Sequence, residues 1–266
     1  MEKIKSLEQI KRPWVVAHRG YRGSYPENTL VAFEAAIMAN ADMIELDVSL
    51  TRDRIPVVIH DNTLDRTTNG SGPVSEHTLA ELKELDAGSW FSTKFSGEAI
   101  PTLKELLMSV KGRITVNIEI KPESFESPDL PDVIESQICE LVEKLEMGDS
   151  VLISSFEHFF FARIHRWYRN QGKSTLPKVA PLLEAPLSEE LALGLCSRQG
   201  AYSFHPDENF VTPSLIETLK ADGFRIFPYT INKERRMEQL IQWGVTGIIS
   251  DEPELVWKVI RKLGMD

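Results

Sequence analysis

Cysteine is scarce in this chain of 266 residues, which contains two of them, Cys139 and Cys196. They lie far apart, in segments with a helical pattern, so they indicate buried thiols in a reducing compartment and not a disulfide framework. The first 14 residues carry charges throughout and lack the apolar core of a secretory signal. These two absences predict a cytoplasmic protein.

Long apolar runs and a surplus of positive charge are also missing. No stretch approaches the roughly 18 consecutive apolar residues that a membrane-spanning helix needs. There are 30 Lys and Arg residues against 40 Asp and Glu residues, and the formal net charge is -10 at pH 7. Such a surface offers no general attraction for nucleic acid or for an anionic membrane, although it is compatible with a local basic pocket. We therefore expect no nucleic-acid partner and no membrane span.

What the sequence does contain is an alternation of short apolar segments and amphipathic segments. The apolar segments predict β-strands at residues 14–17, 42–50, 56–61, 114–121, 151–156, 178–183, 201–204, 225–231 and 247–250. The amphipathic segments predict helices near residues 26–40, 77–85, 101–110, 130–147, 156–170, 188–198, 213–222, 233–243 and 253–263. Thr78 and Thr102 each precede a glutamate by three residues, which is typical of a helix start.

The spacing of the second and third predicted strands decides the architecture. Only residues 51–54 separate them, whereas a parallel neighbour requires a crossover of about a dozen residues. They should form an antiparallel hairpin, which returns His60 towards the neighbourhood of Glu45. Eight strands remain, each followed by a helix, and this pattern predicts one α/β domain over residues 1–266, a (β/α)₈ TIM barrel with a hairpin extension after its second strand.

Residues 62–100 form a small insert between this hairpin and the second barrel helix. The insert is rich in Gly, Ser, Thr and Asn at its beginning. Connections of this length are usually functional. We expect the insert to cap the active site.

Charged or ionisable side chains gather where three predicted strands end: His18, Arg19, Glu45, Asp47, Glu119 and Lys121. Residues two apart on a strand share one face, so both Glu45 and Asp47 should point into the barrel near its carboxyl-terminal end. Grouped carboxylates repel one another unless a cation intervenes, and an all-oxygen set favours Mg²⁺, Ca²⁺ or Mn²⁺. Arg19 and Lys121 suit a phosphate. The residues thus indicate metal-assisted phosphoryl chemistry.

The same side chains fall in blocks that resemble the glycerophosphodiester phosphodiesterase family. In the family's order, the blocks are His18-Arg19-Gly20, Pro26-Glu27-Asn28-Thr29, Glu45-Leu46-Asp47-Val48, His60-Asp61, Glu119-Ile120-Lys121, and the segments at 154–156, 229–232 and 244–253. The resemblance covers the chain from about residue 13 to 255. The chain departs from the family pattern at Tyr229, where many members have tryptophan, and at Thr246, where an acidic residue is common.

This resemblance implies hydrolysis of glycerophosphodiesters to sn-glycerol 3-phosphate and an alcohol, with one divalent cation. It implies that the metal ligands are Glu45, Asp47 and Glu119, that His18 and His60 are the acid/base pair, and that Arg19 and Lys121 contact the phosphate. Further expected substrate contacts are Glu27, Asn28, Phe156 and Tyr229. Glu27 and Asn28 equally suit the beginning of a helix.

Two other functions are compatible with these residues. One is a lysophospholipase D-like or lyase-type phosphodiesterase acting on lysophospholipids, which should expose apolar loops. The other is a non-catalytic barrel that binds a phosphorylated ligand, but a decayed site should have lost a histidine or a carboxylate. The alcohol headgroup, the choice of metal, the oligomeric state and a cyclic phosphate intermediate carry no sequence signal.

Repulsion among the three carboxylates has a consequence for stability. In the absence of a cation, removal of one negative charge should relieve the repulsion. The variant Asp47→Asn is therefore expected to melt no lower than the unmodified metal-free protein.

Overall fold

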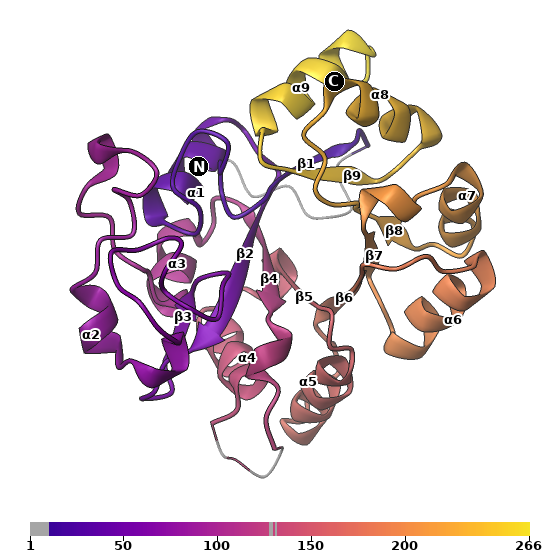
Figure 1. The fold of residues 1–266 in the computed structure, drawn as a ribbon. Helices are drawn as coiled ribbons and strands as arrows, with labels where there is room; N and C mark the ends of the chain where they lie inside the picture. The colour runs from indigo at the N-terminus through magenta and orange to yellow at the C-terminus, as the bar shows by residue number, and fades with distance from the viewer. Residues whose placement is uncertain (1–10, 128–129, 131) are drawn as a thin grey trace.

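The computed structural model describes residues 11–127, 130 and 132–266, in which strands form a central ring and helices lie outside it (Figure 1). The strands are β1 (Trp14–Ala17), β2 (Met43–Leu50), β3 (Pro56–Val58), β4 (Thr115–Ile120), β5 (Val151–Ser155), β6 (Lys178–Leu183), β7 (Ser203–Pro206), β8 (Arg225–Ile226) and β9 (Gly247–Ser250). The α-helices are α1 (Leu30–Met38), α2 (Leu79–Lys83), α3 (Leu103–Val110), α4 (Ile134–Lys144), α5 (Phe159–Asn170), α6 (Glu189–Gln199), α7 (Pro213–Ala221), α8 (Glu234–Trp243) and α9 (Pro253–Lys262).

The sheet topology confirms the predicted barrel and its hairpin. The strand order is β8-β7-β6-β5-β4-β2-β1-β9, and the neighbours in this order are parallel. β3 lies off this path and pairs antiparallel with β2. The strand predicted at 225–231 ends early at Ile226, ahead of Pro228, which has no N–H to continue a ladder. The helix predicted near 130–147 begins at Ile134, and residue 131 of that prediction lies outside the described residues.

Individual backbone hydrogen bonds, and not a regular ladder, close the ring between β8 and β9. The Thr246 N–H donates to the Ile226 carbonyl at 3.0 Å, and the Ile249 N–H donates to the Pro228 carbonyl at 3.1 Å. The Thr246 side-chain oxygen also accepts the Ile226 N–H at 2.9 Å. Thr246 is one of the two departures from the family pattern. It therefore links β8 and β9, the two strands at the ends of the strand order.

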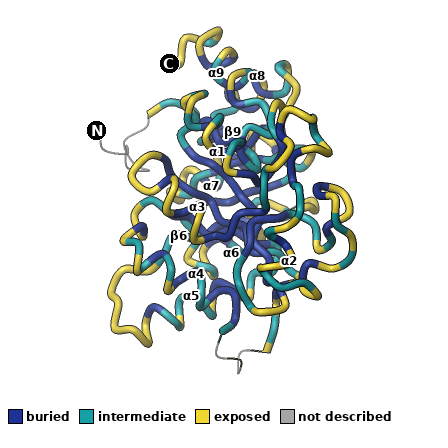
Figure 2. Tube along the Cα trace, turned by 90° about the vertical axis from the view of Figure 1, so that its left-hand side faces the viewer, coloured by how far each residue is buried: buried dark blue, intermediate teal, exposed yellow. Residues whose placement is uncertain are grey.

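Alternation along the strands separates an outer core from the barrel interior. Ile44 belongs to the core between strands and helices. Met43, on the opposite face of β2, belongs to a smaller cluster inside the barrel that includes Trp14. Glu45 and Asp47 share the face of Met43, so both point into the barrel. In a view turned by 90°, buried residues occupy the middle of the molecule and exposed residues its periphery (Figure 2).

The insert at 62–100 packs beside β3, on the flank of the barrel (Figure 1). Its Leu64 and Leu82 form a small apolar cluster with Val57 of β3. The second edge of β3 is also occupied, because the Val58 N–H donates to the Pro101 carbonyl at 2.8 Å and Val57 forms an antiparallel bridge with Thr102. The insert therefore has an apolar core of its own that is anchored on the hairpin.

The structure also bears on the expectations drawn from composition. Cys139 in α4 and Cys196 in α6 are buried free thiols, as predicted. Among the described helices, none has the length and apolar character required to cross a bilayer. The N-terminal stretch used for the prediction about a secretory signal includes residues 1–10, which lie outside the described residues.

The hydroxyl of Thr246 provides a test of barrel closure. Thr246→Val removes the acceptor of the Ile226 N–H, and an unsatisfied buried donor costs about 1–3 kcal/mol. For a domain of this size we expect the melting temperature to fall by roughly 2–4 °C per kcal/mol. Circular dichroism melting curves measure the effect, with Thr246→Ser as the control that keeps the acceptor. Equal melting of Thr246→Val and the unmodified protein would contradict the assigned role.

Candidate active site

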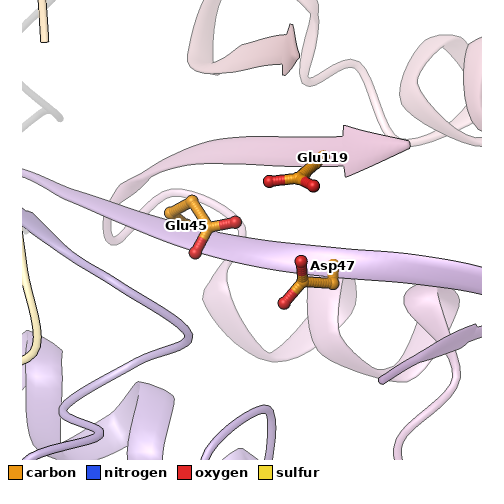
Figure 3. Close-up of side chains that lie close together, drawn as sticks. All are labelled: Glu45, Asp47 and Glu119. Atoms are coloured by element: carbon orange, nitrogen blue, oxygen red, sulfur yellow. The ribbon is translucent and has the colours of Figure 1, made fainter. Parts of the chain in front are cut away.

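Three carboxylates converge inside the barrel near the carboxyl ends of β2 and β4 (Figure 3). Asp47 lies opposite Glu119 in the strand register, and Glu45 lies two residues before Asp47 on the same face. One oxygen of each side chain lies within 4.8 Å of the others, and all three residues are buried. The Glu45 Oε1 atom has no hydrogen-bond partner. This all-oxygen set, with a buried acceptor to spare, fits a hard divalent cation.

The protonation preferences of the three carboxylates differ. Burial, reinforced by the charge of Asp47, raises the pKa of Glu119 to about 7 and also raises the pKa of Glu45 well above its ordinary value. Burial alone would raise the pKa of Asp47 too, but the positive charges of Arg19 and Lys121 lower it overall. The surroundings thus stabilise the negative charge of Asp47 and disfavour that of the two glutamates. Asp47→Asn would relieve repulsion of Glu45 and Glu119, but it would also remove the charge that Arg19 and Lys121 stabilise, and this second effect opposes the expected stabilisation.

Two predicted phosphate contacts and one predicted substrate contact adjoin the carboxylates. Lys121 Nζ lies 2.9 Å from Glu119 Oε1 and 3.6 Å from Asp47 Oδ1. Arg19 Nε lies 3.3 Å from Asp47 Oδ2 and is buried without a hydrogen bond. The Asn28 amide donates to Asp47 Oδ2 at 2.9 Å. Asp47 is therefore held from three directions, and cationic groups lie directly beside the carboxylate set.

The turn between β1 and α1 holds Arg19 and Asn28 in place through unusual backbone geometry. Arg19 has φ 54° and Asn28 has φ 58°, in the left-handed region, and the Asn28 N–H donates to the Arg19 carbonyl at 3.0 Å. Gly20, with φ 82°, has no space for a Cβ atom, which would lie 2.7 Å from the backbone carbon of Ala32. Left-handed backbone at non-glycine residues costs of order 1–3 kcal/mol and clusters at functional sites. Here it directs two side chains towards Asp47.

Glu27 and Asn28 precede the beginning of helix α1, but neither of them caps it. Helix α1 begins at Leu30, and the Thr29 side chain caps it by accepting the Ala32 N–H. Asn28 reaches the carboxylate set, whereas Glu27 binds Arg19 Nη1 at 2.9 Å and lies one contact further out. Burial would raise the pKa of Glu27, but hydrogen bonding and the nearby arginine charges hold it well below its ordinary value.

Each of the two predicted acid/base histidines has a carboxylate partner. His18 Nδ1 lies 2.7 Å from Asp251 Oδ1, and His60 Nδ1 lies 2.6 Å from Asp61 Oδ1. Burial lowers the pKa of both imidazoles, and a neutral ring that donates from Nδ1 presents Nε2 as its free basic nitrogen. His18 Nε2 lies 4.0 Å from Glu45 Oε2, at the edge of the carboxylate set. Each imidazole is thus held through Nδ1 by a neighbouring carboxylate.

Sequence reasoning assigned no role to Asp61 or Asp251, although both lie in blocks that carry the family resemblance. Asp61 directly follows His60, so its position was visible in the sequence. Asp251 follows β9, which pairs in parallel with β1, the strand that precedes His18. Its proximity to His18 follows from the closed strand order and not from any local motif.

Two predicted substrate contacts meet on another part of the rim. Phe156 follows β5 and Tyr229 follows β8, and their rings lie 6.0 Å apart in an edge-on contact. Burial raises the pKa of Tyr229, whose buried hydroxyl has no hydrogen-bond partner. This pair offers an aromatic surface with one polar group.

Known proteins resemble this chain over almost its whole length. The family described as "Glycerophosphoryl diester phosphodiesterase family" matches residues 18–255. A glycerophosphodiester phosphodiesterase of Caldanaerobacter subterraneus subsp. tengcongensis is 41% identical over 251 residues, which are 94% of this chain and 98% of that protein. Another, from Bacillus subtilis, is 35% identical and covers 92% of this chain and 85% of its own length.

Solved structures show the same architecture. A phosphodiesterase of Oleispira antarctica, in complex with the product sn-glycerol-3-phosphate, has a TM-score of 0.79 and 28% identity. The similarity covers 94% of this chain and 97% of that chain. A glycerophosphodiester phosphodiesterase from Agrobacterium tumefaciens has a TM-score of 0.76 and 28% identity, over 92% of this chain and 98% of that chain.

The raised pKa of Glu45 predicts how the metal-free protein responds to pH. For a carboxyl group whose pKa is higher in the folded than in the unfolded state, the stabilising contribution is present below the unfolded value of 4.5 and is lost as pH rises through the folded value. The amide in Glu45→Gln carries no charge at either pH, so the variant does not lose this stabilising contribution as pH rises. We expect the variant to melt above the unmodified protein at about pH 8, by roughly 2–4 °C per kcal/mol recovered, with little difference below pH 4.5.

Calorimetric melting in the presence of a chelator measures this effect at both pH values. Asp47→Asn is the matched variant and should melt lower than the unmodified protein at about pH 8, because Arg19 and Lys121 would lose the charge that they stabilise. A lower melting temperature for Glu45→Gln at that pH would contradict the assigned charge balance.

Proposed function

The chain belongs to the glycerophosphoryl diester phosphodiesterase family, and from this premise we propose that it hydrolyses glycerophosphodiesters to sn-glycerol 3-phosphate and an alcohol. The observation that carries the proposal is the buried set of Glu45, Asp47 and Glu119 with two cationic side chains beside it. The Oleispira antarctica relative, solved with sn-glycerol-3-phosphate, supports the same class of substrate.

Glu45, Asp47 and Glu119 are the proposed ligands of one divalent cation, Mg²⁺, Ca²⁺ or Mn²⁺. When bound, the cation would polarise the phosphoryl group and lower the pKa of a hydroxyl. Because the pKa values of Glu45 and Glu119 are raised, protons compete with the cation for these two carboxylates. A higher metal concentration is therefore expected to be needed for half-maximal activity at lower pH.

Arg19 and Lys121 are the proposed phosphate contacts. Both are charged in this setting, because the pKa values of Arg19 and Lys121 are raised: burial opposes the charge, but neighbouring carboxylates outweigh it. The Arg19 Nε atom is buried without a hydrogen bond and can donate to a phosphoryl oxygen. Their positive charge would stabilise the negative charge that develops on the phosphoryl oxygens in the transition state.

His18 and His60 are the proposed acid/base pair. One would accept a proton from the attacking hydroxyl while the other donates a proton to the departing alcohol. Asp251 and Asp61 would each hold the imidazole in orientation and stabilise its protonated form, as the hydrogen bonds at 2.7 and 2.6 Å allow. A positioned acid or base of this kind contributes about 10²–10⁴-fold to the rate.

The nucleophile is proposed to come from the substrate. Both cysteines are buried in outer helices, so a thiol intermediate is unsuited to this site. The glycerol moiety carries a hydroxyl next to its phosphorylated carbon. Attack of that oxygen on phosphorus would form a cyclic phosphate and expel the alcohol, and water would then open the ring to sn-glycerol 3-phosphate with the histidine roles reversed.

The insert at 62–100 is proposed to border the substrate side of this site. Its Arg66 binds Asp61, the partner of His60, with Nε 2.7 Å from Oδ2. A small hollow lined by Glu27, Asn28, His60 and Thr67 lies where the insert meets the β1–α1 turn. A cap in this place would also limit the access of water to the histidine.

An apolar pair supports lysophospholipids as a second substrate class. Phe159, at the start of α5, is 70% exposed, and Phe125, in the connection after β4, is 42% exposed. Their rings lie 6.4 Å apart, on connections that leave the carboxyl ends of their strands. Exposed aromatic pairs of this kind suit an acyl chain or a lipid interface.

The decisive assay measures release of sn-glycerol 3-phosphate. Purified protein is incubated with glycerophosphocholine, glycerophosphoethanolamine, glycerophosphoglycerol or lysophosphatidylcholine, in the presence of Mg²⁺, Ca²⁺, Mn²⁺ or a chelator. We expect release from the soluble diesters with a cation and none with the chelator. Choline release from lysophosphatidylcholine at a comparable rate would establish the second class. Absence of cleavage under every condition would refute the enzymatic proposal.

Asp47→Asn tests the metal ligands in the same assay. Asp47 is a proposed ligand that also accepts a hydrogen bond from Asn28. Its loss should lower activity at least about 10-fold and lower metal affinity by about 10–100-fold. Isothermal titration with the metal alone separates binding from turnover. Full activity of the variant in the presence of chelator would exclude the proposed metal site.

A substrate without the neighbouring hydroxyl tests the cyclic route. A phosphodiester of propanediol that keeps the phosphate but lacks this hydroxyl should bind as a competitive inhibitor and resist cleavage, because no internal nucleophile is present. Phosphorus NMR of the natural substrate should show the cyclic phosphate at early times. Cleavage of the deoxy substrate at a similar rate would favour direct attack by water.

A further inference from the structure

Glu27 is buried, with 4% of its surface exposed, and it binds three arginines at once. It is not one of the three carboxylates that converge inside the barrel. Its Oε1 lies 2.9 Å from Arg19 Nη1, and its Oε2 lies 2.8 Å from Arg22 Nε. Arg66 binds it with two nitrogens, at 2.9 and 2.8 Å. One buried carboxylate thus accepts hydrogen bonds from three guanidinium groups.

Each of these arginines continues towards a different part of the site. Arg22 Nη1 reaches Asp251 Oδ2 at 3.3 Å, and Asp251 holds His18. Arg66 reaches Asp61 through Nε at 2.7 Å and Nη2 at 2.9 Å, and Asp61 holds His60. The order of contacts, read outwards from the centre, is the same on both sides: glutamate, arginine, aspartate, histidine.

The third arginine links Glu27 to the carboxylate set. Arg19 Nε lies 3.3 Å from Asp47 Oδ2, and the Arg19 backbone N–H donates to Glu45 Oε2 at 2.9 Å. His18 Nε2 also lies 4.0 Å from Glu45 Oε2. Through its three arginines, Glu27 is thus linked to both histidine–aspartate pairs and to the carboxylate set.

We propose that Glu27 is a positioning residue that fixes both histidine–aspartate pairs relative to the carboxylate set. The inference rests on the proposed function, and it extends that function to a residue outside the carboxylate set. Guanidinium groups bind carboxylates in a planar fork, so each arm transmits orientation as well as charge. Rates of positioned acids and bases respond to displacements of about 1 Å by up to about 10²-fold. Removal of the centre should therefore slow turnover without removing a reacting group.

The first test replaces the centre of the network. Glu27→Gln keeps the shape but removes the charge, and its amide hydrogens face arginines. We expect kcat for glycerophosphocholine to fall about 10- to 100-fold. The change in KM should be smaller, because Arg19 loses a partner in this variant but Lys121, the other proposed phosphate contact, is held by Glu119 and Asp47. Glu27→Asp restores the charge at a shorter reach and should recover part of the loss. Arg113→Gln, which breaks the exposed Arg113–Glu34 pair outside the site, is the control and should leave kcat unchanged.

The second test separates the two arms by the leaving group. In a p-nitrophenyl ester of glycerol phosphate, the leaving group departs as the stable nitrophenolate anion and needs no proton. The histidine that protonates the alcohol is therefore dispensable for the release of nitrophenolate in the first turnover, which is the quantity measured. Arg22→Gln removes a contact with Asp251, the partner of His18. Arg66→Gln removes the contacts with Asp61, the partner of His60. We expect one of the two variants to recover with the nitrophenyl substrate and the other to stay slow. Equal loss on both substrates for both variants would reduce these contacts to a structural role and overturn the proposal.

A crystal structure of Glu27→Gln gives a readout that does not depend on activity. We expect displaced Arg22 and Arg66 side chains and at least one imidazole rotated away from its aspartate. Unmoved His18 and His60 rings would overturn the positioning role, even if the assay of the unmodified protein succeeds. Absence of activity in the unmodified protein, with displaced rings in the variant, would instead refute the proposed hydrolysis and leave the positioning role supported.

Discussion

Asp47 and Glu119 face each other because β2 and β4 pair in continuous parallel register from Met43 and Thr115 to Val48 and Ile120. The period of a strand is two residues, so a slip of β2 by one residue would turn Glu45 and Asp47 outwards and bring their apolar neighbours into the barrel. Ile44, on the outer face, is fully buried against the helices. The apolar outer face thus enforces the register, and the register places the carboxylates. The position of every cation and imidazole described above is defined relative to that pair.

Burial of so many charges costs stability, and the molecule offsets the cost with paired partners. Lys121 and Arg19 neutralise Asp47, and the left-handed turn at Gly20 keeps Arg19 in reach. The charge of the two glutamates stays unfavourable, as the pKa of Glu119 near 7 shows. Burial of the charged carboxylates of Glu45 and Glu119 lowers the free energy of unfolding. Binding of a ligand of opposite charge beside them would offset this loss of stability.

Much of this arrangement was predictable from the sequence, and the failures have physical causes. Strand ends carry local signals, so the placement of Glu45, Asp47 and Glu119 in one cluster followed from alternation and strand order. The partner of His18 had no local signal, because Asp251 becomes its neighbour only when β9 closes on β1. Arg66 was missed for a related reason: it lies in an irregular insert, where no periodicity predicts the direction of a side chain.

β3 has a consequence for the behaviour of the protein at high concentration. A strand outside a closed barrel ordinarily presents unpaired N–H and C=O groups on which another chain can add a strand. Here the outer edge is occupied by the segment around Pro101 and Thr102, which pairs with Val57 and Val58. Pro56 at the start of the strand has no N–H to offer. The hairpin therefore carries His60 to the active site without presenting a free strand edge on which another chain could add a strand.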